Sequence, residues 1–264
     1  MRKTLLLVLF IPIGLSLRAQ NQSNYKYYHQ QVVEIETLIA NEKFAPALST
    51  YEDLFEQYDF VFRRDYQIAS QLAWHQENEK KASDLITKGI KAGWTLKGIK
   101  KNDFLEDFRK TTSWKNLRKQ YKNLHQIYQE SLDQDLQNEV KKMFSKDQWK
   151  ALGALFVFNE KGYRRYAEKK FAPHSIKQVQ QLQKILNAST YPGERLIGNN
   201  FWASTILSHH NSTTPEIVKA DTLYLSIKPQ LDLALEDLDR AAGTEPCMVT
   251  VGGQGAPAQY LFEP

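Results

Sequence analysis

The spacing of apolar residues between positions 29 and 93 predicts paired amphipathic helices. Apolar side chains recur every three or four residues, which places them along one face of each helix. The first face consists of Val32, Ile35 and Ile39, and that of the next helix of Ala47, Tyr51, Leu54 and Phe55. Each face needs a neighbour to cover it, so the segment predicts helices packed against one another.

The tripeptide Asn-Glu-Lys occurs at positions 41–43 and again at 78–80, an offset of 37 residues. Both copies are followed by an alanine and a leucine at matching positions, namely Ala45 and Leu48, then Ala82 and Leu85. Tetratricopeptide repeats have a period of 34 residues and use small side chains to pack two antiparallel helices. Residues 25–130 therefore predict a degenerate tetratricopeptide-like helical region of about two units, too few for a solenoid by themselves.

A longer amphipathic helix is predicted from Ser113, which can act as its N-cap. Its apolar positions are Trp114, Leu117, Tyr121, Leu124 and Tyr128. Lysine and arginine residues occupy the opposite face, and we interpret that face as solvated.

A second helical domain is predicted from Ser131, with a first apolar stripe at Leu136, Val140 and Met143. The stripe is expected to continue through Trp149, Leu152, Leu155 and Phe156. An aromatic and basic cluster follows at Tyr163, Arg164, Arg165 and Tyr166. We interpret these aromatic residues as part of a core, and the alternative is a platform on which a base or a sugar stacks.

Pro173 is expected to end one helix, because proline lacks the backbone N–H that a helix interior requires. Ser175 can then cap a helix that ends before Pro192. The apolar positions of that helix are Ile176, Val179, Leu182 and Ile185.

The stretch from position 191 to 212, YPGERLIGNNFWASTILSHHNS, combines turn and helix signals. Pro192 and Gly193 suit the two central positions of a type II turn. Asn199 or Asn200 can cap the helix that follows. On that helix one face carries Trp202, Ile206 and His209, and the neighbouring face carries Ala203, Leu207 and His210. Both histidines are therefore expected at the ends of apolar stripes.

Taken together, the pattern predicts an all-α protein with two helical domains, at 25–130 and 131–242. A further helix is expected beyond Thr214, with Leu223, Ile227, Leu231 and Leu235 on one face. The last residues, 243–264, are rich in glycine, alanine and proline, and no lysine follows Lys228. We expect this tail to be disordered, and either divergent or derived from an altered reading frame.

Residues 1–19 have the pattern of a secretory signal peptide, with Arg2 and Lys3 before an apolar run and Ala19 at the cleavage point. This predicts export to the periplasm or beyond. It also predicts that the protein is not a lipoprotein, because no cysteine stands at the cleavage point. Removing the segment discards three basic residues and lowers the formal net charge from +5 to +2, which argues against a nucleic-acid partner. Cys247 is the only cysteine, so an internal disulfide is excluded.

The motif Tyr-Pro-Gly-x-x-Leu-Ile-Gly at 191–198, followed by Ser-His-His-Asn at 208–211, resembles the bacterial family called domain of unknown function 6624. The segment VKKMFSKDQ at 140–148, which ends in an Asp-Gln pair, is similar to the opening helix of that family. The resemblance covers about residues 136–235 and implies no activity.

These observations identify a candidate functional surface without a catalytic residue, a cofactor or a metal. Its members are Tyr191, Pro192, Gly193, Glu194, Arg195, Gly198, His209, His210, Asn211, Asp147 and Gln148. Adjacent histidines project about 100° apart on a helix, whereas two ligands on one helix stand three or four positions apart. The pair therefore does not predict a metal site.

Two functions remain open on the sequence. The first is a protein- or ligand-binding module of the cell envelope, since paired helices present surfaces for partners. The second is an enzyme of unknown chemistry that uses Tyr191, Arg195, His209 and His210. The sequence favours the first, because it contains no nucleophile motif.

Overall fold

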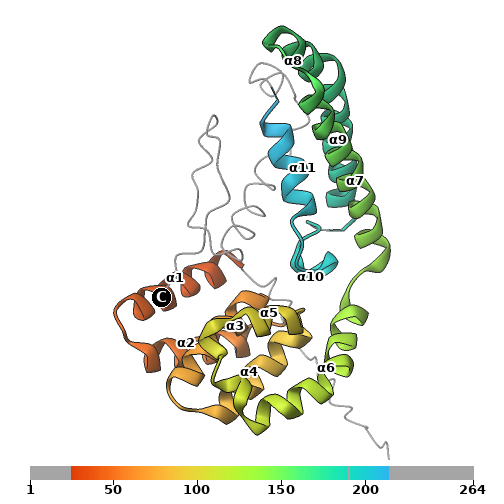
Figure 1. The fold of residues 1–264 in the computed structure, drawn as a ribbon. Coiled ribbons are helices and arrows are strands. Elements are labelled where there is room, and N and C mark those ends of the chain that lie inside the picture. Colours follow the sequence, from red (N-terminus) through yellow and green to blue (C-terminus); the bar gives the residue numbers. More distant parts are fainter. Residues whose placement is uncertain (1–24, 190, 214–264) are drawn as a thin grey trace, which may run out of the picture.

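The structure is a computed structural model that describes residues 25–189 and 191–213. Every regular element in this part of the chain is helical, which confirms the all-α prediction (Figure 1). The elements are α1 (Tyr25–Ala40), α2 (Phe44–Gln57), α3 (Arg63–His75), α4 (Glu79–Lys91), α5 (Leu96–Lys101), η1 (Asp103–Leu105), η2 (Phe108–Lys110), α6 (Thr112–Ser131), α7 (Gln134–Leu152), η3 (Gly153–Phe156), α8 (Glu160–Tyr166), η4 (Ala167–Phe171), α9 (Ala172–Ala188), α10 (Glu194–Ile197) and α11 (Trp202–Asn211).

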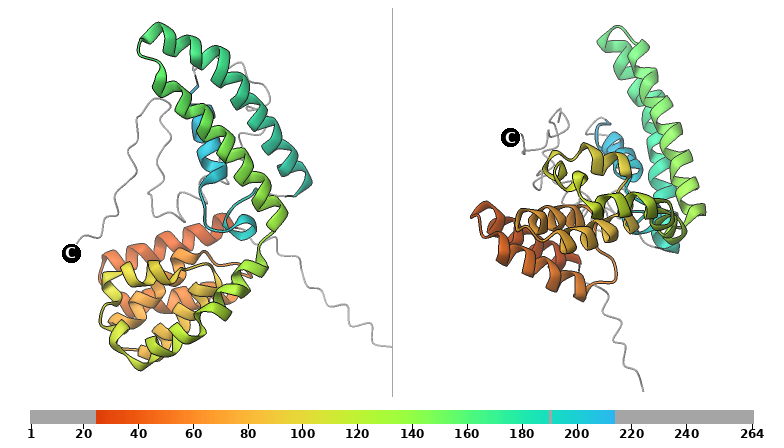
Figure 2. Two further views of the ribbon diagram at one scale, coloured as in Figure 1. Left: turned by 45° about the vertical axis from the view of Figure 1, so that its right-hand side comes forward. Right: turned by 60° about the horizontal axis from the view of Figure 1, so that its bottom comes forward.

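Two hydrophobic clusters organise these helices. The first contains buried residues between Tyr28 and Leu124 and holds α1 to α6 together. The second lies between Leu136 and Leu207 and joins α7, α9, α10 and α11. Figures 1 and 2 show the second set of helices as an elongated arm that rises from the first. The clusters lie on either side of position 131, where the sequence predicts the start of the second domain.

Helices α1 to α4 form two successive hairpins with closely similar turns. Glu42 and Glu77 both have φ near +58°, and they are 35 residues apart. In each turn the following residue donates its N–H to a carbonyl five positions earlier, Lys43 to Leu38 and Asn78 to Ala73. The two turns are thus 35 residues apart, and this offset relates buried Ala47 to buried Ala82, whereas the sequence offset of 37 relates Ala45 to Ala82.

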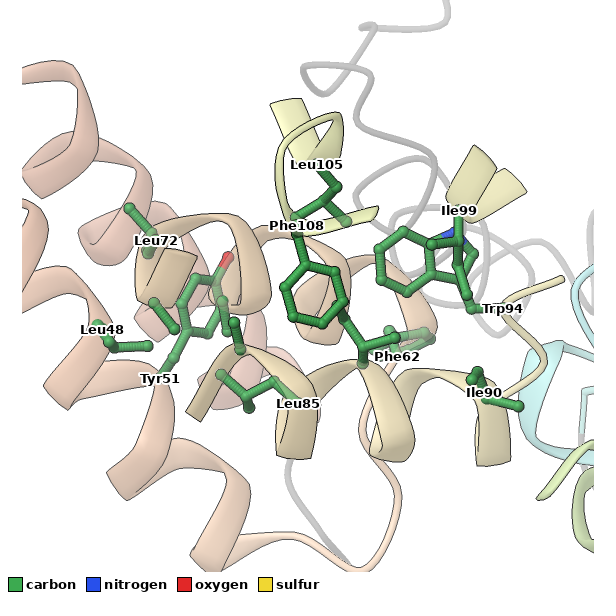
Figure 3. Packing of buried hydrophobic residues seen from close by; sticks show 14 of the residues in the cluster. Leu48, Tyr51, Phe62, Leu72, Leu85, Ile90, Trp94, Ile99, Leu105 and Phe108 are labelled. Atoms are coloured by element: carbon green, nitrogen blue, oxygen red, sulfur yellow. The ribbon is translucent and has the colours of Figure 1, made fainter. Parts of the chain in front are cut away.

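The core of the first cluster is filled by aromatic and branched side chains from helices far apart in sequence. Tyr51, Phe108 and Trp94 lie in one continuous layer with leucine and isoleucine side chains around them (Figure 3). Trp74 meets the edge of Phe108 at 5.4 Å between ring centroids. This packing ties the short elements α5, η1 and η2 to the hairpins.

The N-cap of helix α6 lies two residues before the cap predicted at Ser113. Thr111 is the N-cap, and its hydroxyl accepts the N–H of Trp114 at 3.2 Å. Threonine at this position satisfies one of the open N–H groups of the first turn.

The predicted stripe of the second domain is buried only in its first part. Leu136, Val140 and Met143 pack against α9 and α11. The prediction that the stripe continues as core is wrong in the described part of the chain. Its exposed members are Trp149 (76 % exposed), Leu152, Leu155 and Phe156. Tyr163, on α8, is also exposed, and among the described helices α7 extends past the end of α11.

Pro173 does not end a helix, contrary to expectation. The chain passes from α8 through one wide π-helical turn, η4, into α9, and Pro173 occupies the first turn of α9. Proline is tolerated there because that N–H has no partner within the helix in any case. Ser175 consequently lies buried inside α9 and is not a cap.

The type II turn predicted at Pro192 and Gly193 is not formed. Gly193 has φ −93°, whereas the second central residue of such a turn needs a positive φ. The positive angle occurs instead at Gly198, with φ +82°, where α10 ends. The cap predicted for α11 is only partly present, since Asn200 accepts the N–H of Trp202 at 3.4 Å while Phe201 is the N-cap.

Tyr128 on α6 joins the two sets of helices. Its ring lies against the backbone of Gly93, where an added Cβ would come within 2.6 Å of Cζ. Its hydroxyl lies against Gly198 and accepts the N–H of Asn199 at 3.2 Å. Two glycines with positive φ thus leave room for one tyrosine at the base of the arm.

Several predictions concern parts of the chain outside the described residues. They are the signal peptide at 1–19, the helix with Leu223 to Leu235, the tail at 243–264 and Cys247. Among the described helices, none combines the length and apolar character needed to cross a bilayer.

Replacing Gly198 with alanine is expected to lower the free energy of unfolding by about 2 to 4 kcal/mol. A Cβ there would strain a backbone at φ +82° and collide with the Tyr128 hydroxyl. Gly193→Ala is the matched control, because φ is −93° and the nearest atom lies 3.3 Å away. Urea unfolding of both variants measures the difference, and equal stabilities would contradict this role of Gly198.

Candidate functional site

The predicted surface residues fall into two groups at opposite ends of α11. Tyr191, Pro192, Gly193, Glu194, Arg195 and Gly198 lie at the base of the arm beside α10 (Figure 1). Asp147, His209 and His210 lie near the other end of α11. The structure therefore does not bring Tyr191 and Arg195 to the histidines.

Glu194 connects the base of the arm to α3. Its side chain is buried, one carboxylate oxygen accepts the backbone N–H of Arg63 at 2.8 Å, and the other accepts from Asn199 at 2.7 Å. Arg63 is the first residue of α3, so a residue 131 positions away caps that helix. Arg195 lies 3.7 Å from Asp59 in a largely exposed ion pair, a contact of small energetic value.

A second buried carboxylate lies close to this cap. Asp65, in the first turn of α3, accepts a 2.5 Å hydrogen bond from the Tyr28 hydroxyl. Burial raises the pKa of Asp65 to about 6, and the negative charge of Glu194 adds to that rise. Burial likewise raises the pKa of Glu194, against the hydrogen bonds that favour its charged form. The contact at the base of the arm thus contains two buried carboxyl groups, each with a raised pKa.

Asp147 is the centre of the group at the other end. Its side chain is 1 % exposed and belongs to α7. One carboxylate oxygen is hydrogen-bonded to Nδ1 of His209 on α11, and the other lies 3.8 Å from Nε2 of His174 on α9. A buried carboxylate, an imidazole from each of two helices and the ring of Phe171 between them form what we call the Asp147 cluster.

The contact with Asp147 determines which nitrogen of His209 carries a proton. An ionised carboxylate can only accept a hydrogen bond, so Nδ1 must be the donor. In the neutral ring Nε2 then keeps its lone pair. The His209 side chain is 28 % exposed, so the ring is partly accessible to solvent. A ring oriented in this way can accept a proton or a hydrogen bond at Nε2.

His174 is held as a neutral ring. Burial lowers the pKa of His174, and this effect is larger than the rise caused by Asp147. The positive charges of Lys150, Lys146 and Lys177 lower the pKa further. The Gln178 amide nitrogen lies 3.4 Å from Nε2 of His174 and donates to the carbonyl of Met143 at 2.8 Å. Because an amide nitrogen can only donate, Nε2 is the acceptor and Nδ1 carries the proton.

His210 has a different environment from its neighbour. It is fully buried, and its Nδ1 lies 2.7 Å from the hydroxyl of Ser175. Thr213 returns a hydrogen bond to its carbonyl at 2.6 Å. The contact with Ser175 fastens the end of α11 to α9, and the role of His210 is therefore structural.

A shallow groove of about 460 Å³ opens beside the Asp147 cluster. Its lining consists of Lys146, Trp149, Lys150, Tyr166 and His174. Tyr166 is fixed as a wall, since its hydroxyl donates to the carbonyl of Lys150 at 2.7 Å and its ring crosses Gly153. Only His174 belongs to both the groove and the cluster.

A larger depression of about 590 Å³ lies on α4 near Glu52. Four of its nine lining residues are lysines, and one of these, Lys81, is paired with Glu52 at 2.7 Å. None of the residues on the predicted surface borders it.

Sequence reasoning missed His174, Ser175 and the basic and aromatic groove. His174 was available as an isolated histidine two positions before Ile176, but no spacing links it to Asp147. Gln148 and Asn211, which were predicted, are half-buried and make no hydrogen bond to the Asp147 cluster in the described structure.

Metal binding has no support from the described geometry. Within residues 25–189 and 191–213, no group of three or more histidine, cysteine, aspartate or glutamate side chains is arranged to hold a metal ion. The hydrogen bond of His209 to Asp147 also engages one nitrogen and one oxygen that could otherwise bind a metal ion.

Comparison with known proteins found no matching family model, no similar curated protein and no similar solved structure.

The free energy of unfolding is expected to depend on pH through Asp65. Its pKa of about 6 in the folded state exceeds the unfolded value of 3.8, so the folded state binds more protons between these limits. Stability from this group is therefore greatest below pH 4 and is lost as the pH rises to about 6. Asp65→Asn should stabilise the protein relative to wild type by on the order of 2 to 3 kcal/mol more at pH 7 than at pH 4.

Urea unfolding at the two pH values measures this difference, and Asp53→Asn, an exposed carboxylate on α2, is the control. If the free energy of unfolding differs between wild type and Asp65→Asn by the same amount at both pH values, the raised pKa of buried Asp65 is contradicted.

Replacing His210 with alanine is expected to lower the free energy of unfolding by about 2 to 4 kcal/mol, because it removes a buried ring and strands the Ser175 hydroxyl. His75→Ala, at an exposed histidine of α3, should change it far less. Thermal unfolding of both variants tests the structural role of His210. Similar melting temperatures for His210→Ala and His75→Ala would rule that role out.

Proposed function

We propose that this chain is an exported ligand-binding protein whose site is the groove beside the Asp147 cluster. The observation that carries the proposal is that His174 borders the groove while contacting buried Asp147, which in turn binds His209. Side chains that line a hollow and are held in place by buried polar partners are typical of binding sites. Export rests on the sequence of residues 1–19.

The two-part architecture supports a binding function in a second way. The arm projects from a helical base with two hairpins of similar turn geometry, and the contact at Glu194 joins the two. Under this proposal the base anchors the arm and the arm carries the ligand. The similarity of residues 136–235 to family 6624 is part of the proposal and adds no activity to it.

A second candidate function is acid–base catalysis at His209. The observation that favours it is the hydrogen bond that orients the ring through Nδ1 and leaves the Nε2 lone pair for a reacting group. This version of the enzyme hypothesis replaces Tyr191 and Arg195, which lie at the base of the arm, with Asp147.

The proposal is tested by native mass spectrometry of the protein isolated from its own cells. Wild type is expected to retain a small molecule, and Lys150→Glu, which reverses a charge in the groove, should reduce its occupancy by about fivefold or more. Lys142→Glu, an exposed lysine on the same helix outside the groove, is the matched control. A wild-type protein without a bound small molecule, or equal occupancy in Lys150→Glu, contradicts the proposal.

The same experiment separates the two candidates when His209→Gln is included. A glutamine amide can still donate to Asp147, but it cannot take up a proton. A binding protein should carry the same molecule in wild type and variant. An enzyme should retain a molecule of different mass in the variant, because the substrate is bound and no longer converted.

A further inference from the structure

We propose that the ligand of the groove is an organic anion, a phosphate or a carboxylate attached to a flat ring. This inference rests on the proposed function and specifies its ligand class. It is based on the kinds of side chain that the groove places next to one another.

The charges around the groove favour an anion. Lys146 and Lys150 stand four positions apart on α7, so both project from the same face of the helix into the groove. Lys177 on α9 is close enough to His174 to affect its charge state. The carboxylate beside His174, Asp147, is buried and hydrogen-bonded to His209, so it does not pair with these lysines at the surface.

The uncharged lining favours a flat ring. Trp149 is 76 % exposed and lies between the two lysines in sequence, which offers a large aromatic face at the edge of the groove. The ring of Tyr166 forms a second aromatic wall, and its hydroxyl is already engaged as a donor. Aromatic faces next to cationic groups suit ligands that stack a ring and present a negative charge.

His174 adds a directional donor to this set. Its Nε2 accepts from Gln178, so the neutral ring keeps one N–H donor, at Nδ1. Since the ring is partly buried, with 16 % of the side chain exposed, its orientation is set by the protein rather than by the ligand. A groove of about 460 Å³ is large enough for a single ring with its anionic group.

The test is a titration of the full chain with four probes. Binding is measured from the NMR resonances of the Trp149 indole and the His174 ring. Phenyl phosphate and benzoate carry both a ring and a charge, inorganic phosphate carries only the charge, and benzyl alcohol carries only the ring. We expect the two ring-bearing anions to bind with Kd values on the order of 1 mM, and the other two probes to bind at least about fivefold more weakly. The ratio of phenyl phosphate to benzoate affinity shows which anionic group the groove prefers.

Variants identify the groups responsible. Lys146→Gln and Lys150→Gln should each weaken phenyl phosphate binding by about fivefold and leave benzyl alcohol unchanged. Trp149→Ala should weaken both ring-bearing anions by a similar factor. Lys142→Gln is the control and should change nothing. Raising the salt concentration should weaken the anions selectively, because their attraction to exposed lysines is screened.

Two results would overturn the inference and can be told apart. If benzyl alcohol binds as tightly as phenyl phosphate and the lysine variants bind normally, the ligand class is wrong but a binding groove remains. If no ring-bearing probe shifts the Trp149 or His174 resonances, the groove is not a binding site, and the proposed function fails with the inference.

Discussion

The burial of Asp147 is the constraint on which the arm depends. A carboxylate that is 1 % exposed is unstable inside a protein unless hydrogen bonds replace its lost water. In the described part of the chain this hydrogen bond comes from His209 on α11, while the neutral ring of His174 on α9 lies 3.8 Å away. The hydrogen bond from His209 therefore carries most of the stabilisation. It joins α7 to α11 and sets the orientation of the His209 ring, while His174 on α9 contacts the same carboxylate and borders the groove.

A second buried carboxylate controls the base of the arm. Glu194 caps α3 across 131 residues of sequence, and Tyr128 fills the space left by Gly93 and Gly198. Side-chain caps are normally supplied by the residue next to the helix, so a cap from another part of the chain couples two helical sets. A buried carboxylate thus stands near each end of α11: Glu194 fixes the arm to the base, and Asp147 joins α11 to α7 near the groove.

Apolar periodicity predicted much of the fold and little of the site. Helices, their buried faces and the placement of His210 at the end of an apolar stripe follow from spacing within a single helix, which the sequence records. Contacts between helices do not, because Asp147 and His209 are 62 positions apart and no local rule pairs them. The exposed end of α7 illustrates the same limit, since the stripe at Trp149 and Phe156 is regular but is left uncovered by the described helices. Pro173 was misassigned because it lies in the first turn of α9, directly after the wide turn η4, where a proline is tolerated.

The central claim is that His209 is fixed by Asp147 through Nδ1. Long-range ¹H–¹⁵N NMR of the imidazole rings measures the protonation of each nitrogen directly. The account predicts that neutral His209 carries its proton on Nδ1, and that Asp147→Asn shifts this resonance while leaving those of exposed His75 unchanged. A neutral His209 with its proton on Nε2, unaffected by Asp147→Asn, would contradict it.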